Sequence, residues 1–211
     1  MSRLFTLFAL LLGAPVLAAA QPLVTPTELS ARLGEPQLRI VDIRDGRNDA
    51  GQTPYEVAHI AGSLPAPYSK WRGPKGNPGK LPGEEALTRL VRSLGIDAAT
   101  PVVVVYEGSN PTDFGAAARV YWTLKAAGVP NLSILNGGVK AWRAANLPLV
   151  TDVPTVAPST FTVKIDPRLV ATQDEVASVI GKDGVRLLDA RPASYFFGET
   201  RHAAAKTPGT L

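Results

Sequence analysis

The chain has 211 residues, 45% of them hydrophobic, and it contains no cysteine. This length and composition predict one or two globular domains with an apolar core, and the lack of cysteine excludes disulfide bonds. The formal net charge is +4 and the basic residues are scattered, which argues against a nucleic-acid partner but is compatible with weak attraction for small anions.

The first twenty residues have the pattern of a secretory signal peptide. Arg3 supplies the positive charge, residues 4–12 form the apolar run, and three alanines at 18–20 give a cleavage site of small residues. An uncleaved membrane anchor is the alternative, although the run is short for a spanning helix and Pro15 interrupts it. We therefore expect residues 1–20 to be a signal peptide and the mature protein to be exported to the periplasm, without membrane contact after cleavage.

Strand and helix patterns then alternate along the chain. Thr25 and Glu28 form a capping box that opens a short helix, which is expected to end at Gly34 in the left-handed conformation. The next elements expected are a strand over 38–43, a loop over 74–82, a helix over 84–94, a strand over 102–106, a helix over 113–127, a strand over 132–135 and a helix over 139–145. This alternation predicts an α/β fold, with a mainly parallel sheet covered by helices on both faces.

The beginning of this pattern recurs at the C-terminal end of the chain. Residues 25–64 align without a gap with residues 172–211 at an offset of 147, and eleven of the forty pairs are identical. About two or three identities are expected by chance at ordinary residue frequencies. The duplication predicts a tandem repeat with a truncated second copy.

The second copy repeats the local signals of the first. Thr172 and Glu175 form a second capping box, a helix is expected to end at Gly181, and a strand pattern covers 185–190. The domains expected are a first domain over 23–150, a linker over 151–166 and a partial second domain over 167–211. About 45 residues rarely bury enough apolar surface alone, so we expect this last part to be marginally stable.

The order of several short motifs resembles that of the rhodanese family. These motifs are Val41-Asp42-Ile43-Arg44, His59-Ile60-Ala61-Gly62-Ser63-Leu64, the strand over 102–106, and Leu135-Asn136-Gly137-Gly138 before Trp142. The duplication is similar to that of tandem thiosulfate and 3-mercaptopyruvate sulfurtransferases, whose first domain is usually degenerate. The resemblance implies a rhodanese-like parallel sheet flanked by helices, with one complete domain and the N-terminal part of a second.

The resemblance also implies a reaction that needs no cofactor. In that family a cysteine thiolate after the central strand takes a sulfane sulfur from a small anionic donor such as thiosulfate, and the persulfide passes it to an acceptor. Backbone amides at a helix N-terminus stabilise the thiolate. Here Glu107 occupies the nucleophile position, and the equivalent position in the second copy is 107 + 147 = 254, beyond Leu211. We therefore expect no catalytic residue in this chain and no sulfurtransferase activity.

Other polar residues are candidates for cleft or structural positions. They are Asp42, Arg44, His59, Asp189, Arg191 and Tyr195. The two Asp-x-Arg pairs follow strand patterns, where they serve either cleft electrostatics or an ion pair that fixes the next turn. His59 is expected to order its turn by a backbone hydrogen bond. His202 has no second ligand at a metal spacing, so no metal site is expected. Tyr195 stands where catalytic tandem members often carry a substrate-binding arginine.

Three functions other than sulfur transfer are alternatives for this sequence. The first is a non-catalytic rhodanese module that binds an anion or a partner protein, whose identity the sequence leaves open. The second makes Glu107 and Asp113 a general acid–base pair, although no histidine or metal ligand lies nearby in sequence. The third is a phosphatase similar to the rhodanese-fold cell-cycle phosphatases, which fails because it also needs a cysteine.

Overall fold

The fold is that of a computed structural model, which describes residues 21–201, 205, 207 and 209. The expected signal peptide and His202 lie outside the described residues. The core is a five-stranded sheet, parallel throughout, with the strand order β1-β5-β4-β2-β3. Its strands are β1 (Leu23–Val24), β2 (Arg39–Asp42), β3 (Ser63–Pro65), β4 (Val102–Val105) and β5 (Leu132–Leu135). This sheet confirms the predicted α/β class.

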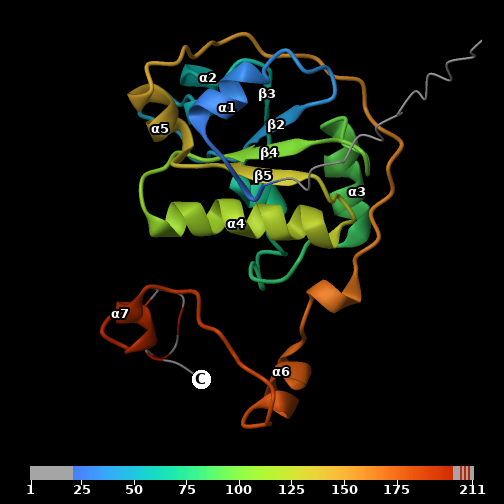
Figure 1. The fold of residues 1–211 in the computed structure, drawn as a ribbon, viewed down its shortest axis with the longest axis vertical. Coiled ribbons are helices and arrows are strands. Elements are labelled where there is room, and N and C mark those ends of the chain that lie inside the picture. Colours follow the sequence, from blue (N-terminus) through green and yellow to red (C-terminus); the bar gives the residue numbers. More distant parts are fainter. Residues whose placement is uncertain (1–20, 202–204, 206, 208, 210–211) are drawn as a thin grey trace, which may run out of the picture.

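Helices cover both faces of the sheet (Figure 1). One face packs against α1 (Pro26–Ala31) and α5 (Gly138–Ala144), and the other against α3 (Glu84–Ser93) and α4 (Pro111–Ala126). The shorter elements are α2 (Pro54–Val57), η1 (Tyr68–Trp71), η2 (Pro167–Leu169), α6 (Gln173–Val179) and α7 (Ala193–Phe196). No helix in the described part of the chain is long and apolar enough to cross a membrane.

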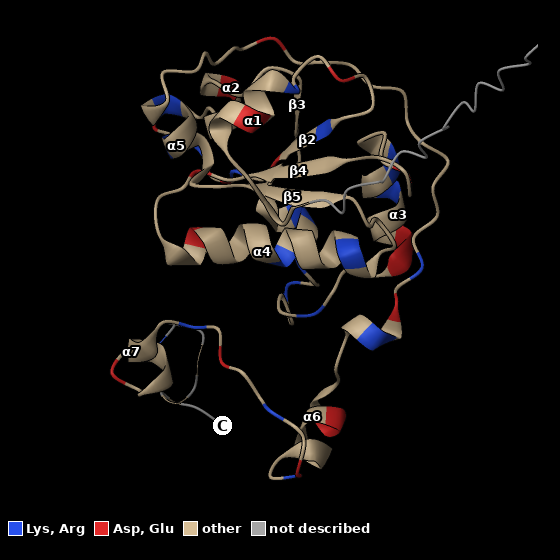
Figure 2. Cartoon of the chain, in the orientation of Figure 1, with Lys and Arg blue, Asp and Glu red and all other residues tan. Residues whose placement is uncertain are grey.

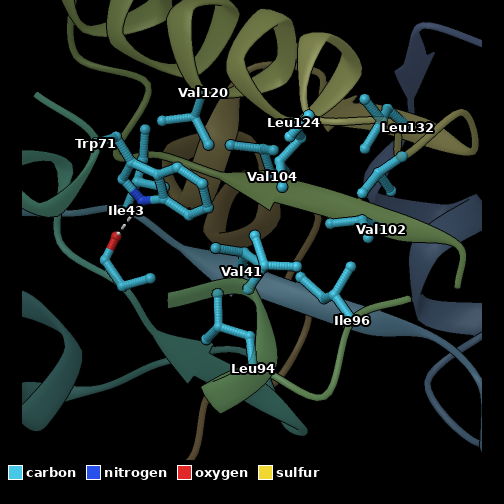
Figure 3. Close-up of a cluster of buried hydrophobic side chains, with 14 of the residues drawn as sticks. Val41, Ile43, Trp71, Leu94, Ile96, Val102, Val104, Val120, Leu124 and Leu132 are labelled. Carbon is cyan, nitrogen blue, oxygen red and sulfur yellow. Dashed lines mark hydrogen bonds between the residues drawn. The ribbon is translucent and has the colours of Figure 1, made fainter. Parts of the chain in front are cut away.

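The central strand β4 joins two apolar layers, because its side chains alternate between the faces of the sheet. Val102 and Val104 point into the layer formed with α3 and α4, which also contains the buried Trp71 (Figure 3). Val103 and Val105 point into the layer formed with α1 and α5. A run of β-branched residues buried on both faces is the pattern from which this strand was predicted.

The predicted capping boxes form at both helices. The Thr25 side chain accepts a hydrogen bond from the Glu28 amide, while Glu28 accepts one from the Thr25 amide, and the same exchange joins Thr172 and Glu175 at α6. Gly181 has the left-handed φ expected after α6. The prediction for Gly34 is wrong, because α1 ends earlier, at Ala31, and its C-cap is Arg32 in the right-handed region.

The predicted linker is packed along the domain. Ser159 Oγ donates to the Ile96 carbonyl at 2.6 Å, and Arg92 Nε donates to the Phe161 carbonyl at 2.7 Å. Val163 is buried in the α3/α4 layer. This segment is therefore a strap on the first domain, held by hydrogen bonds and apolar contacts along its length.

Residues 167–211 build no sheet in the part of the chain that the structure describes. The strand predicted over 185–190 is wrong here: the segment has no strand pairing, and Leu188 is 89% exposed. The equivalent strand β2 is fixed by hydrogen-bonded neighbours on both sides, β3 and β4. In Figure 1, α6 and α7 lie apart from the layers that would supply such neighbours. The apolar pattern alone is insufficient, since a strand needs partners for its backbone groups.

One stability prediction arises from Tyr55 in α2. Its hydroxyl donates to the Ser63 carbonyl at 2.7 Å, and burial, reinforced by the charge of Asp42, raises the pKa of Tyr55 to about 12. A raised pKa means that the folded state holds this proton more tightly, so its contribution to stability is complete below about pH 10 and is lost as the pH rises towards 12.

We therefore expect the free energy of unfolding to fall by about 1–3 kcal/mol more in the wild type than in Tyr55→Phe over this pH range. Urea denaturation at several alkaline pH values measures the difference. The phenylalanine keeps the ring that stacks on His59 but has no proton to lose. Parallel curves for the two proteins would contradict the prediction.

Candidate functional site

The site lies at the carboxyl edge of the sheet, in the loop between β4 and α4. The loop is held against the turn before α5, because the amides of Val139 and Lys140 donate to the carbonyls of Tyr106 and Glu107, each at 2.8 Å. A Cβ added to Gly108, which has φ +90°, would lie 2.0 Å from the Gly137 carbonyl oxygen. The two turns therefore approach so closely that only glycine fits between them.

Asp42 and Arg44 form a buried ion pair at the end of β2. Arg44 Nε donates to both Asp42 carboxylate oxygens at 3.0 Å, Nη2 donates to Oδ2 at 2.7 Å, and the Arg44 amide donates to Oδ1 at 3.0 Å. Nη2 also donates to the Ala58 carbonyl at 2.7 Å. Burial alone would lower the pKa of the Arg44 guanidinium, but hydrogen bonds and charge from Asp42 and Glu107 raise it overall. The ion pair therefore fixes the turn that follows β2. Arg44 also contacts the cleft, because its Nη1 donates to Glu107.

Glu107 joins the loop to both neighbouring elements. Its Oε2 accepts from Arg44 Nη1 at 3.3 Å, and its Oε1 accepts from Arg143 Nη1, in α5, at 2.6 Å. The Arg44 side chain is 2% exposed, whereas those of Glu107 and Arg143 are 37% and 48% exposed. The position expected for a nucleophile therefore holds a carboxylate whose two oxygens are each paired with a different arginine.

Asp113 accepts the hydrogen bonds of the loop amides. Its Oδ2 is 2.7 Å from the Gly108 amide, 2.9 Å from the Ser109 amide and 3.1 Å from the Ser109 hydroxyl. Asn110 caps α4 by accepting from the Asp113 amide at 3.0 Å. The Gly108 and Ser109 amides are thus satisfied within the protein. No hydrogen bond joins the described side chains of Asp113 and Glu107 as an acid–base couple.

His59 is buried and has a structural position. Its Nδ1 is 2.9 Å from the Tyr55 carbonyl and its Nε2 is 3.0 Å from the Asp152 carbonyl, so the ring ties α2 to the start of the strap. The ring also stacks on Tyr55 with a centroid distance of 3.8 Å. Within the described residues, no group of His, Asp and Glu side chains is arranged to hold a metal ion.

Asp189 and Arg191 repeat the local geometry of Asp42 and Arg44 in an exposed setting. The Arg191 amide donates to Asp189 Oδ1 at 3.0 Å, and Arg191 Nε donates to the same oxygen at 2.9 Å. These hydrogen bonds lower the pKa of Asp189 to about 2. The spacing of the motif therefore dictates the ion pair, while the surrounding sheet decides whether the pair is buried.

A cavity of about 1030 Å³ lies between the β4–α4 loop and the C-terminal segment that includes Arg191 and Tyr195. Tyr68, Arg72 and Thr112 line it on the side of the first domain, and Arg191 and Tyr195 line it on the other. Of the predicted site residues, Asp42, Arg44 and Glu107 meet at the first-domain loop, whereas Arg191 and Tyr195 border this separate cavity.

Arg143 was not identified from the sequence. It lies 36 residues after Glu107 and comes close to it because the turn before α5 packs on the β4–α4 loop. The sequence feature that could have identified Arg143 is its position as the basic residue in the last turn of α5. Lys and Arg elsewhere are interspersed with Asp and Glu over several elements (Figure 2).

The fold and the loop define the class of this protein. It contains a parallel α/β domain whose cleft is built by a strand-to-helix turn at the carboxyl end of the central strand, with an Asp-x-Arg pair on the neighbouring strand. Ligand clefts of open parallel sheets form at this edge.

Residues 25–145 match the model of the rhodanese-like domain family, and this match covers more than half of the chain. The chain therefore belongs to the rhodanese family, which confirms the resemblance found in the sequence. The mitochondrial thiosulfate/3-mercaptopyruvate sulfurtransferase 1 of Arabidopsis thaliana is 31% identical over 86% of this chain and 53% of its own length. A probable 3-mercaptopyruvate sulfurtransferase of Pseudomonas aeruginosa is 32% identical over 84% of this chain and 64% of its own length.

Solved structures also match the fold of this chain. The crystal structure of SseA from Escherichia coli matches with a TM-score of 0.70 and 25% identity, covering 85% of this chain and 69% of that one. YnjE matches with a TM-score of 0.72 at 22% identity, over 89% of this chain and 46% of that one, which supports the fold. The chain thus spans about half to two thirds of the two curated relatives.

Proposed function

We propose that this chain supplies the non-catalytic rhodanese domain of an exported sulfurtransferase-type protein. The observation that carries the proposal is the position of Glu107, whose carboxylate lies at the nucleophile position and is paired with Arg44 and Arg143. The curated relatives named for thiosulfate and 3-mercaptopyruvate support sulfane-sulfur transfer as the activity of the whole protein. The repeat of residues 25–64 at 172–211 supports a tandem arrangement.

Sulfane transfer needs a group that this chain lacks. A thiolate attacks the outer sulfur of thiosulfate, a new S–S bond forms, the old S–S bond breaks, and sulfite leaves with the electron pair. The persulfide then gives its outer sulfur to a thiophilic acceptor and the thiolate is restored. A carboxylate is a poor acceptor of sulfane sulfur, and its negative charge repels the thiosulfate dianion. The described loop therefore keeps the form of the family's cleft without its chemistry.

The test is a thiosulfate:cyanide assay on the purified chain. We expect thiocyanate to form no faster than in a boiled control, because the chain contains no cysteine. Turnover that scales with protein concentration and survives repurification would refute the proposal.

A second candidate is a binding module that holds an anion or a partner without turnover. The cavity lined by Arg72 and Arg191 favours it, since two arginines from distant parts of the sequence border the same space. Saturable binding of thiosulfate by the wild type, lost in Arg72→Ala and unaccompanied by thiocyanate, would support this candidate.

A further inference from the structure

We propose that Glu107 is an internal ligand: its carboxylate fills an oxyanion site formed by Arg44 and Arg143, and thereby keeps oxyanions out of the first-domain cleft. The inference rests on the proposed function, because it concerns how a non-catalytic rhodanese loop stays closed.

Arg44 is oriented as it would be for a bound anion. Three of its contacts, through Nε and Nη2, fix the guanidinium plane against Asp42, and Nη2 is also held by the Ala58 carbonyl. Nη1 is the nitrogen that faces the loop, and its partner there is Glu107 Oε2. A buried guanidinium held in this way recognises an oxyanion without further loss of side-chain freedom.

Arg143 completes the site from the opposite side. It reaches Glu107 Oε1 from α5, so that the two carboxylate oxygens are divided between two guanidinium groups. Sulfate and thiosulfate present oxygens that two arginines bind by charge-assisted hydrogen bonds in the same manner. The Glu107 carboxylate thus makes the contacts that a small oxyanion would make.

The charges of the four side chains joined by ion pairs balance only while Glu107 is present. Asp42 and Glu107 contribute two negative charges, and Arg44 and Arg143 contribute two positive ones. Removing Glu107 leaves one net positive charge on the remaining three side chains and a space of about the size of a carboxylate. The Gly108 and Ser109 amides already donate hydrogen bonds to Asp113. An oxyanion that enters the opened site would therefore bind the two guanidinium groups and not these amides.

The experiment is calorimetric titration of sulfate into Glu107→Ala at low ionic strength. We expect saturable binding at least about tenfold tighter than in the wild type, as the freed charge-assisted hydrogen bonds imply. Glu85→Ala is the matched control, because it also removes a glutamate paired with an arginine, Arg89, but on the exposed face of α3. The gain should disappear in the double variant Glu107→Ala/Arg143→Ala.

Three results would overturn the inference. They are a folded Glu107→Ala that binds no sulfate, equal binding by Glu107→Ala and Glu85→Ala, and wild-type binding that Arg143→Ala abolishes. If Glu107→Ala does not fold, Glu107→Gln keeps the side-chain volume and tests the charge, and its affinity must then exceed that of Glu85→Ala. The proposed function survives a negative result, because thiocyanate formation by the wild type is a separate measurement.

Discussion

Replacing Arg44 with methionine is expected to lower the free energy of unfolding by about 3–5 kcal/mol. The substitution leaves the Asp42 carboxylate buried, with a fully covered side chain, and without its counter-charge. It also removes the hydrogen bond to the Ala58 carbonyl and one of the two partners of Glu107. A methionine of similar length fills most of the space, so the lost charge accounts for most of the effect.

Chemical denaturation followed by tryptophan fluorescence measures this change, because Trp71 and Trp142 are fully buried in the first domain. The matched control is Arg32→Met, which breaks an exposed pair with Glu35 and should cost about 0.5 kcal/mol or less. The double variant Asp42→Asn/Arg44→Met should recover part of the loss, since no buried charge remains. Equal changes in the free energy of unfolding for Arg44→Met and Arg32→Met would contradict the prediction, because they would mean that burial of the pair does not affect stability.

Gly108→Ala is expected to destabilise the domain by roughly 3 kcal/mol or more. The residue has φ +90°, which costs an alanine about 1–2 kcal/mol, and its new Cβ would lie 2.0 Å from the Gly137 carbonyl oxygen. The clashing atom belongs to the backbone and cannot move by a change of rotamer. The β4–α4 loop must therefore separate from the turn before α5, and this overpacking lowers the free energy of unfolding further.

The control for this prediction is Gly115→Ala in α4. No atom lies within 4 Å of the Cβ that it would add, and its φ lies outside the left-handed region. Alanine at this helical position should be neutral or stabilise by about 0.5–1 kcal/mol. Thermal unfolding of the two variants compares them directly, and similar melting temperatures would mean that the loop accommodates the methyl group.

The central elements of the fold were predictable because their signals are local. The β-branched run Val102–Val105 predicts a strand buried on both faces. Each Thr-x-x-Glu box pairs the first amides of a helix with side chains no more than three residues away. The edge strands β1 and β3 have two and three residues, too few for a pattern, and their pairing is decided by β5 and β2. A third capping box forms at α2 between Thr53 and Glu56. It was not predicted, although the sequence has the same Thr-x-x-Glu spacing there.

The site was predictable only in part. The Asp-x-Arg spacing dictates a local ion pair, which forms at Asp42/Arg44 and again at Asp189/Arg191. Burial of the first pair depends on β4, whose paired residues lie 63 positions further along the chain (105 − 42), and this long-range packing has no local signal. Arg143 reaches Glu107 for the same reason, through the close approach of two turns.

We expect the first-domain cleft to take up no sulfur, although the domain has the rhodanese fold. The most direct measurement is intact-mass spectrometry of the chain after incubation with excess thiosulfate and removal of the free anion. The predicted result is an unchanged mass, because the chain contains no cysteine on which a persulfide could form. A mass increase of one sulfur atom that cyanide then removes would contradict the claim.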